Sequence, residues 1–444
     1  MASLIVVLII IGCAVFQYFK GTIVRAFATI VVAIIAGLVA FGFFEALANV
    51  FISRGGDSKF ISLVPWAQTL SFILLYVLIF AILQTGLTFL TRQPVDLGVL
   101  PERIGRVICG ILLGLLVSGF LLTAFQMAPL PVGYPYKRFD PVKLEADSPN
   151  RVLFNADGFV TGLFSTMSNG SFRGKRSFGM LHPNYLDQLF FNRLTRVGET
   201  SIISSLTPAI QLPNPAVWPA SEAIREQADR FVTELKTRGG KLAFDDSGRF
   251  VPLPVSTKGG DNPTIVRIGI RKRAIRSDAK VNGGAFTPSQ LRLICKRKGS
   301  TDEGLAGKGI NVYPIGFLKS ANEIQVSPEI KLATDNFGRN ADTKEIDFVF
   351  RVPNGFEPAL VQYKLNSIVE IPQRAIVSID QAPSPIAFTP GSSSGGNRSN
   401  RGNRDNAGGS SPPQERAPQQ RPQRPPGGRG ARDITGTIAD ELDR

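Results

Sequence analysis

The residues of this sequence best suited to binding chemistry are cations between positions 267 and 298. Ten Lys or Arg lie in this stretch with a single acid, Asp278. On two neighbouring strands they would make a continuous positive face, which attracts phosphate-rich polymers and anionic lipid head groups. The alternative is a solvated strand face whose counter-charges come from elsewhere. The residues expected to bind an anionic partner are Arg267, Arg271, Lys272, Arg273, Arg276, Arg292, Lys296, Arg297 and Lys298.

The surroundings of these cations indicate which anion they would bind. Aromatic side chains are not interleaved among them in the way that stacks nucleobases, so nucleic acid is not the expected partner. An anionic lipid, a lipopolysaccharide or a wall polymer is expected instead. A second basic region has eight Arg between Arg398 and Arg432. Its irregular spacing and lack of aromatic residues favour a solvated tether over an RNA-binding tract.

The residue types and spacings of this sequence do not match a known catalytic site. His182 is the only histidine, and Asp246-Ser247-Gly248 resembles the sequence around a nucleophilic serine. However, the segment between His182 and Ser247 is too short for the two barrels of a chymotrypsin-like protease. A structural hydrogen bond suits His182 better, because Leu-His-Pro-Asn is a turn-like context. Ser277-Asp-Ala-Lys280 matches an S-x-x-K pattern without its companion motifs. We therefore expect no catalytic residues and no enzymatic activity.

Metal and cofactor sites are not expected either. One histidine and three isolated cysteines, at positions 13, 109 and 295, do not make a ligand cluster. The sequence contains no P-loop and no dinucleotide-binding fingerprint. Two of the cysteines lie in apolar stretches, so no disulfide framework can form in the remaining part of the chain.

The elements that must position these residues begin with an almost uncharged N-terminal block. A helix needs about 20 apolar residues to cross the hydrocarbon layer of a membrane. Four stretches come near that length, and none alternates as the strands of a membrane barrel do. We therefore expect residues 1–127 to form an α-helical bundle of four transmembrane helices. The stretches are centred on Ala2–Phe19, Ala26–Phe44, Trp66–Leu90 and Val107–Phe125.

The polar turns between these stretches predict the orientation of the bundle. Cytoplasmic loops favour Lys and Arg, and the first and third turns together carry five of them, against two in the second. Both termini are therefore expected outside the cytoplasm, together with the whole C-terminal region. The cations on the cytoplasmic side are Lys20, Arg25, Arg92, Arg103 and Arg106, and those on the other side are Arg54 and Lys59.

Small residues at helical spacing occur in the second and fourth stretches. Ala33 and Gly37 lie in the second, and Gly110 and Gly114 lie in the fourth. Residues of this size four positions apart let helix backbones approach closely, which drives association in lipid. The alternative is that Gly and Ala are simply common in membrane helices. Because the bundle is small, a homo-oligomer is also expected.

The first 127 residues carry a family resemblance. The turn Phe19-Lys20-Gly21-x-x-x-Arg25 and the segment Leu97–Gly119 (LGVLPERIGRVICGILLGLLVSG) resemble the colicin V production protein family. These are bacterial inner-membrane proteins with several spans. The resemblance implies a link to toxin production or export and to homeostasis of the cell envelope. It brings no catalytic residues and no cofactor with it.

The remaining chain divides into three regions by its pattern. Residues 128–262 read as a Pro-rich collar followed by a helical subdomain that packs on the membrane surface. Its helices are expected at Val152–Met167, Tyr185–Leu194 and Ser221–Thr237. Residues 263–374 alternate between apolar and polar side chains, which predicts an antiparallel β-sandwich. Residues 383–444 contain almost no apolar side chains and are expected to be a disordered basic tail.

The strands expected in the sandwich can be placed individually. The stretch DFVFRVPNGFEPALVQYK resembles the closing strands of an immunoglobulin-like sandwich, with Asn354-Gly355 as a break between two strands. The strand segments expected are 266–270, 291–296, 310–318, 323–326, 346–352 and 360–371.

Two functions of different classes remain open at this point. The first is a non-enzymatic envelope protein whose extracytoplasmic domain contacts a partner or an anionic polymer while the bundle anchors it. The second is a small transporter or channel formed by oligomers of the bundle. The second function requires Glu45, Gln68 and Gln84 to face a shared lumen, because intramembrane polar residues mark transport pathways.

Overall fold

The computed structural model describes the chain as far as residue 389, with internal gaps. The Asp246-Ser247-Gly248 motif, Lys280 and most of the predicted tail lie outside the described residues. The described residues are 1–19, 22–55, 61–90, 98–141, 144–170, 177–194, 201–237, 243–244, 250–251, 253–256, 261–279, 285–299, 305, 307–332, 336–338 and 341–389.

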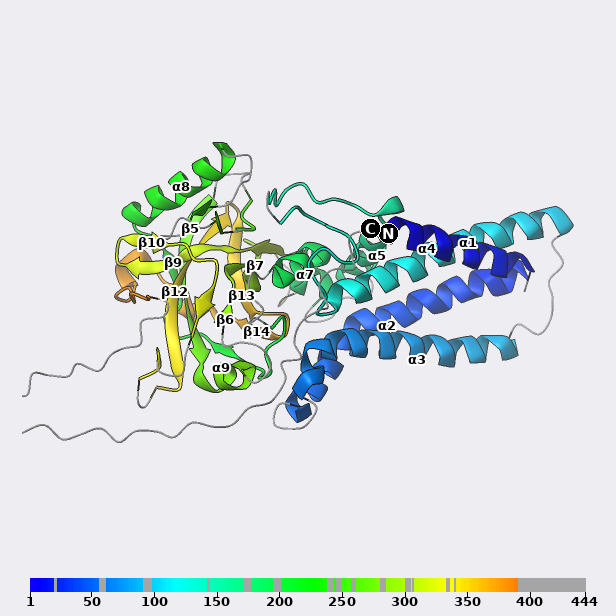
Figure 1. The fold of residues 1–444 in the computed structure, drawn as a ribbon, viewed down its shortest axis with the longest axis horizontal. Coiled ribbons are helices and arrows are strands. Elements are labelled where there is room, and N and C mark those ends of the chain that lie inside the picture. The colour runs from blue at the N-terminus through cyan, green and yellow to red at the C-terminus, as the bar shows by residue number, and fades with distance from the viewer. Residues whose placement is uncertain are drawn as a thin grey trace, which may run out of the picture. The chain divides into compact units, whose positions relative to one another are not determined.

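Four long apolar helices occupy the N-terminal part of the chain (Figure 1). Each is long and apolar enough to cross a membrane, by length and composition. The second helix, with 33 residues, is about 50 Å long at roughly 1.5 Å per residue. It therefore exceeds the ~30 Å hydrocarbon layer of a bilayer. The helices are α1 (Ala2–Phe19), α2 (Ile23–Gly55), α3 (Ala67–Leu90), which follows the 3-10 turn η1 (Ile61–Trp66), and α4 (Val99–Met127).

Close packing between α1 and α4 depends on glycine. A Cβ added at Gly110 would lie 2.5 Å from the Cα of Ala14, and one added at Gly114 would lie 2.6 Å from the Cα of Ile10. Because no side chain can approach a backbone so closely, only glycine allows this contact between the two helices. The other two residues expected at helix contacts are both buried on α2: Ala33 and Gly37.

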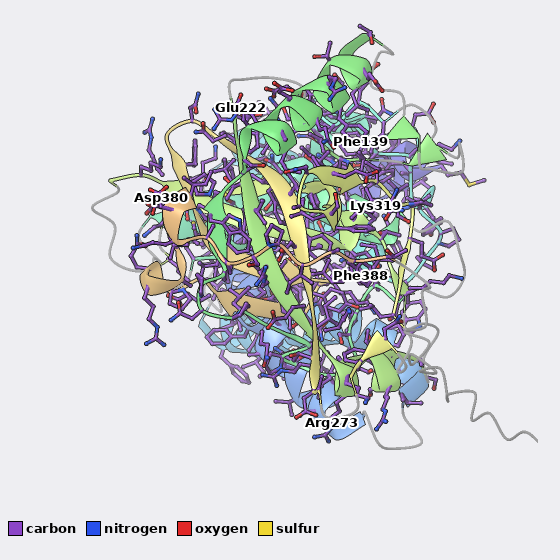
Figure 2. The ribbon with its side chains drawn as sticks, turned by 90° about the vertical axis from the view of Figure 1, so that its left-hand side faces the viewer. Phe139, Glu222, Arg273, Lys319, Asp380 and Phe388 are labelled. Carbon is purple, nitrogen blue, oxygen red and sulfur yellow. The ribbon has the colours of Figure 1, made fainter. Side chains whose placement is uncertain are left out.

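The segment between the bundle and the sheets packs against both. α5 lies along α4 and also contacts α2, where the ring of Phe164 stacks on that of Phe41 with centroids 4.9 Å apart. The collar covers α7, and Phe139, labelled in Figure 2, stacks on Phe191 with centroids 4.9 Å apart. The elements of this segment are η2 (Leu153–Asn155), α5 (Ala156–Asn169), α6 (Phe178–Leu181) and α7 (Tyr185–Arg193).

Two antiparallel sheets follow, as the alternating pattern predicts. The first has the order β1-β5-β12-β9-β10, with β2 also paired to β5, and the second has the order β14-β13-β7-β8. The strands of the first sheet are β1 (Ile210–Gln211), β2 (Val217–Pro219), β5 (Asp261–Arg271), β9 (Pro314–Ser320), β10 (Glu323–Gln325) and β12 (Thr343–Pro353). Those of the second are β7 (Leu291–Arg297), β8 (Ile310–Val312), β13 (Phe356–Tyr363) and β14 (Ser367–Glu370).

Shorter elements complete this region. Two small strand pairs are β3 (Ala243–Phe244) with β4 (Phe250–Val251), and β6 (Ala285–Phe286) with β11 (Ile330–Lys331). The helices are α8 (Glu222–Thr237) and α9 (Lys272–Ala279), and the 3-10 turns are η3 (Pro288–Gln290), η5 (Gln373–Ala375) and η6 (Ile379–Gln381).

One apolar core is shared by the two sheets. Val266 and Ile268 of β5 alternate into it and belong to one buried cluster with Leu293 of β7 and Val361 of β13. The first sheet includes β1 and β2, so the sheet region begins well before residue 263. The chain also changes sheet at the Asn354-Gly355 turn, because β12 belongs to the first sheet and β13 to the second.

The other face of the first sheet is covered by α8. The helix predicted at residues 221–237 is confirmed, with Ile224 and Ala228 buried against Ile265 and Val349. Its expected position on a membrane surface is wrong, because its apolar stripe is used to cover the sheet. β5 is consequently buried on both faces over most of its length.

The start of the predicted tail belongs to the folded part of the chain. Phe388, labelled in Figure 2, is 2% exposed and packs against Phe317 with ring centroids 5.3 Å apart. Its backbone N–H donates to the carbonyl of Leu318 at 3.1 Å. The prediction of disorder from residue 383 is therefore wrong for residues 383–389. Three apolar residues, Ile386–Phe388, next to a long polar segment are a weak pattern, which is why the sequence did not reveal this contact.

Candidate functional site

The predicted anion-binding face is not continuous. β5 and β7, which carry many of its cations, belong to different sheets, so the expectation of two neighbouring strands is wrong. Arg267 is 7% exposed. Its Nε and Nη2 atoms donate to the two carboxylate oxygens of Asp347 at 2.7 and 2.9 Å. Its charge is therefore neutralised inside the protein, where a polymer cannot reach it.

The other predicted cations are dispersed. Lys272, Arg273 and Arg276 lie on α9 rather than on a strand, and Figure 2 shows Arg273 at the periphery of the sheet region. The half-buried cations are Arg271, Lys272 and Lys296, and the exposed cations are Arg273, Arg276, Arg297 and Lys298. The exposed ones fall into two groups, one on α9 and one at the end of β7.

The most unusual polar centre of the described residues joins α2 to the sheet region. His182 forms the C-cap of α6, and its Nε2 lies 3.1 Å from Oε1 of Glu45 on α2. His182 is 2% exposed, and the side chain of Glu45 is 25% exposed. Although this distance is that of an ion pair, neither atom has a hydrogen-bond partner among the described residues. The two groups are close, but they are not aligned for a hydrogen bond.

A chain of hydrogen bonds behind His182 determines its tautomer. Nε2 of Gln362 donates to the carbonyl of Leu365 at 2.8 Å, so Oε1 of Gln362 is free to accept. Gln188 donates to that oxygen at 2.9 Å, which leaves Oε1 of Gln188 to accept from Nδ1 of His182 at 3.0 Å. Nδ1 therefore carries a proton, as assigned from this network. The contact between Nδ1 and Nη2 of Arg292, at 3.4 Å, is longer and places two donors together.

Arg292 holds this chain together from β7. It is 2% exposed and donates to the carbonyl of Leu181 at 2.6 Å, as well as to Gln362 and Asn311. Burial lowers the pKa of the guanidinium to about 10, and Tyr313, Glu45 and Tyr185 oppose this shift. Arg292 was expected on a surface that binds anions. It serves instead as an internal donor that fixes the segment around His182.

His182 lies between two cavities. One is a largely apolar groove of about 500 Å³ between α2, α5 and α6, with Glu45 and His182 at its polar end. The other is a polar cavity of about 610 Å³, lined by one face of α5 and by Arg138, Arg151 and Lys308. These volumes are in the range of roughly 300–1,000 Å³ that is usual for ligand pockets.

A second buried charge pair lies within the sheet region. Nζ of Lys364 lies 2.7 Å from Oδ2 of Asp278, and both side chains are fully buried. The remaining carboxylate oxygen accepts from the hydroxyl of Ser204 at 3.1 Å and from the hydroxyl and N–H of Ser205, both at 2.7 Å. Asp278 was expected as a lone acid among surface cations. It is instead the centre of a satisfied polar cluster.

Glu45 and His182 stand out separately in the sequence, but nothing in the sequence pairs them. Each was conspicuous, as an ionisable residue in an apolar stretch and as the only histidine, yet 137 positions separate them. Among the residues that the structure describes, no group of three His, Cys, Asp or Glu could hold a metal ion. Ser247 lies outside the described residues, so its distance from His182 is not defined.

Comparison with protein-family models, with curated proteins and with solved structures finds no match for this chain.

Proposed function

We propose that this chain is a non-enzymatic, multi-pass protein of the bacterial inner membrane, with the sheet region outside the cytoplasm. The observation that carries this proposal is the apolar outer surface of the bundle. Leu8 on α1 is 60% exposed, and Val77 and Ile82 on α3 are 56% and 58% exposed. In water so large an apolar surface is strongly unfavourable, whereas in lipid it costs nothing.

Within this proposal the bundle is an anchor that holds the sheet region in a defined position. Gln68, at the start of α3, donates to the carbonyl of Leu365 in the turn between β13 and β14 at 3.1 Å. Glu45 of α2 also lies 3.1 Å from His182, which is linked to β13 through Gln188 and Gln362, so α2 and α3 both adjoin the sheet region. A domain attached in this way can present a surface to an envelope partner or an anionic polymer. The exposed cations at the end of β7 and on α9 are the candidates for that contact.

The process served is proposed from the resemblance of the first 127 residues to the colicin V production family. It would be toxin production or export, or homeostasis of the envelope.

The channel alternative has less support. It requires Glu45, Gln68 and Gln84 to face a lumen shared between subunits. Glu45 instead lies beside His182, and Gln68 donates to Leu365. Gln84 lies 3.5 Å from the hydroxyl of Thr29, at the limit of a hydrogen bond. These groups contact atoms of their own chain, which favours an anchor over a pore.

Labelling of two single-cysteine variants in intact spheroplasts tests the proposed location. Arg297→Cys, exposed at the end of β7, is expected to react with a membrane-impermeant maleimide. Arg103→Cys, exposed near the other end of the bundle on α4, is expected to react only after the membrane is permeabilised. The wild type, with its native cysteines, supplies the background. The reverse labelling pattern contradicts the orientation, and recovery of the chain in the detergent-free soluble fraction contradicts the membrane location.

A further inference from the structure

We propose that the groove between α2, α5 and α6 binds a membrane lipid with a neutral hydroxyl head group, whose hydroxyl contacts Glu45 and His182 from the groove side. The inference rests on the proposed membrane location, because the ligand must enter from the bilayer. It adds a ligand class and a binding site to that proposal.

The groove is open to a lipid chain along α2. Its lining includes Ile35 and Phe43, which are 42% and 61% exposed on the surface that we place in the membrane. Gly42 lies between them on the same wall, and a Cβ added there would meet no atom within 4 Å. An acyl chain can therefore pass sideways from the bilayer to the interior of the groove, where Phe164 and Phe178 make its apolar wall.

The polar end of the groove lacks a hydrogen bond that a hydroxyl would supply. Oε1 of Glu45 and Nε2 of His182 are both buried at the atom level, and neither has a partner among the described residues. Since Nδ1 of His182 already donates to Gln188, only Nε2 faces Glu45. Leaving buried polar atoms unpaired is unfavourable, so this pair is a site for a group that both donates and accepts.

A hydroxyl satisfies this pair in either protonation state. With a proton on Nε2 as well as on Nδ1, the imidazolium donates to the hydroxyl oxygen and the hydroxyl donates to the carboxylate of Glu45. With the proton on Glu45, the carboxylic acid donates and Nε2 accepts instead. A phosphate monoester, which is mainly an acceptor and carries negative charge, fits neither arrangement beside a carboxylate. Among the described residues that line the groove, none is Lys or Arg to offset that charge.

Photo-crosslinking of the full-length protein in phosphatidylcholine nanodiscs tests the inference. The probe is a 1,2-diacylglycerol with a diazirine in one acyl chain. We expect crosslinks on α2 and α6, and competition by unlabelled 1,2-diacylglycerol but not by phosphatidic acid with the same chains. Equal competition by phosphatidic acid would overturn the choice of head group. Crosslinks confined to the outer surface of α3 would overturn the site.

Two glycine variants make a matched pair for the groove itself. Gly42→Leu fills the groove, and we expect crosslinking to fall about tenfold, which corresponds to ~1.4 kcal/mol of binding free energy. Gly86→Leu places the same side chain on α3, away from the groove, where an added Cβ also meets no atom within 4 Å. It should leave crosslinking unchanged. Equal labelling of both variants would overturn the inference, and the competition experiment on the wild type tests it even where a variant folds poorly. A chain that stays soluble without detergent would instead reject the membrane location.

Discussion

Two pairs of ionisable side chains, Asp278–Lys364 and Glu45–His182, differ in how completely their atoms are satisfied. Asp278 and Lys364, within the sheet region, lie 2.7 Å apart and are fully buried. Two serines donate to the same carboxylate. Glu45 and His182, where α2 meets the sheet region, lie 3.1 Å apart without a hydrogen bond among the described residues. The first pair is therefore a structural support, and the second keeps hydrogen-bonding capacity that its own chain does not use.

The backbone around Lys364 supports this distinction. Lys364 has a φ of 53°, which is in the left-handed region that residues other than glycine rarely adopt. Its N–H donates to the carbonyl of Gln290 at 2.7 Å while Nζ reaches Asp278. A strained residue persists where surrounding contacts hold it, and here they do so on both sides. No comparable backbone strain occurs at His182, whose φ is −127°.

The largest effect is expected from breaking the satisfied pair. Lys364→Met leaves Asp278 buried without its counter-charge, which should lower the free energy of unfolding of the sheet region by about 3–5 kcal/mol. The native thiol of Cys295 on β7 provides the measurement, in a variant that lacks the cysteines at positions 13 and 109. Burial raises the pKa of this thiol and shields it, so alkylation requires the sheet region to open.

The control for this variant is an exposed lysine on the same region. Lys319, labelled in Figure 2, forms an exposed pair with Glu323 at 3.1 Å. Lys319→Met should change the rate of Cys295 alkylation little, because exposed pairs contribute at most about 1 kcal/mol. An unchanged alkylation rate in Lys364→Met would show that the buried pair is not a support.

A smaller effect is expected at Arg292, whose hydrogen bonds hold the segment around His182. Arg292→Lys keeps the charge, but a single ammonium cannot reach the three acceptors that the planar guanidinium holds. We expect a loss of about 1.5–3 kcal/mol in the free energy of unfolding, as for hydrogen bonds to charged groups. Arg297→Lys, on the same strand but exposed, is the matched control. Equal alkylation of Cys295 in both variants would contradict the role assigned to Arg292.

Local structure could be predicted from the sequence, whereas the pairing of distant segments could not. Long apolar stretches and alternating segments depend only on local pattern, so the sequence predicts all four helices and most strands, although α2 extends to Gly55 and α4 begins at Val99, beyond the apolar stretches. Which strands become neighbours depends on contacts between distant parts of the chain. For this reason β5 and β7, expected side by side, lie in different sheets.

The candidate site could not be predicted from the sequence for the same reason. A charge such as Arg267 or Arg292 in an alternating strand is expected to face water, because burial of an unpaired charge is unfavourable. The partners that make burial possible, Asp347 and Gln362, lie on other strands, 80 and 70 positions away in the chain. Sequence alone shows where the charges are, but not which of them are neutralised inside.

The smallest effect is expected at the pair that the structure leaves unsatisfied. Glu45→Gln replaces a carboxyl group that is 25% exposed and whose Oε1 has no hydrogen-bond partner among the described residues. The free energy of unfolding of the sheet region should therefore change by less than about 1 kcal/mol. Alkylation of Cys295 again provides the measurement. Glu102→Gln, which removes the partner of Arg106 on α4, is a control within the bundle. If Glu45→Gln accelerated alkylation as much as Lys364→Met, the two pairs would be equivalent supports. The distinction between a support and a ligand site would then be lost.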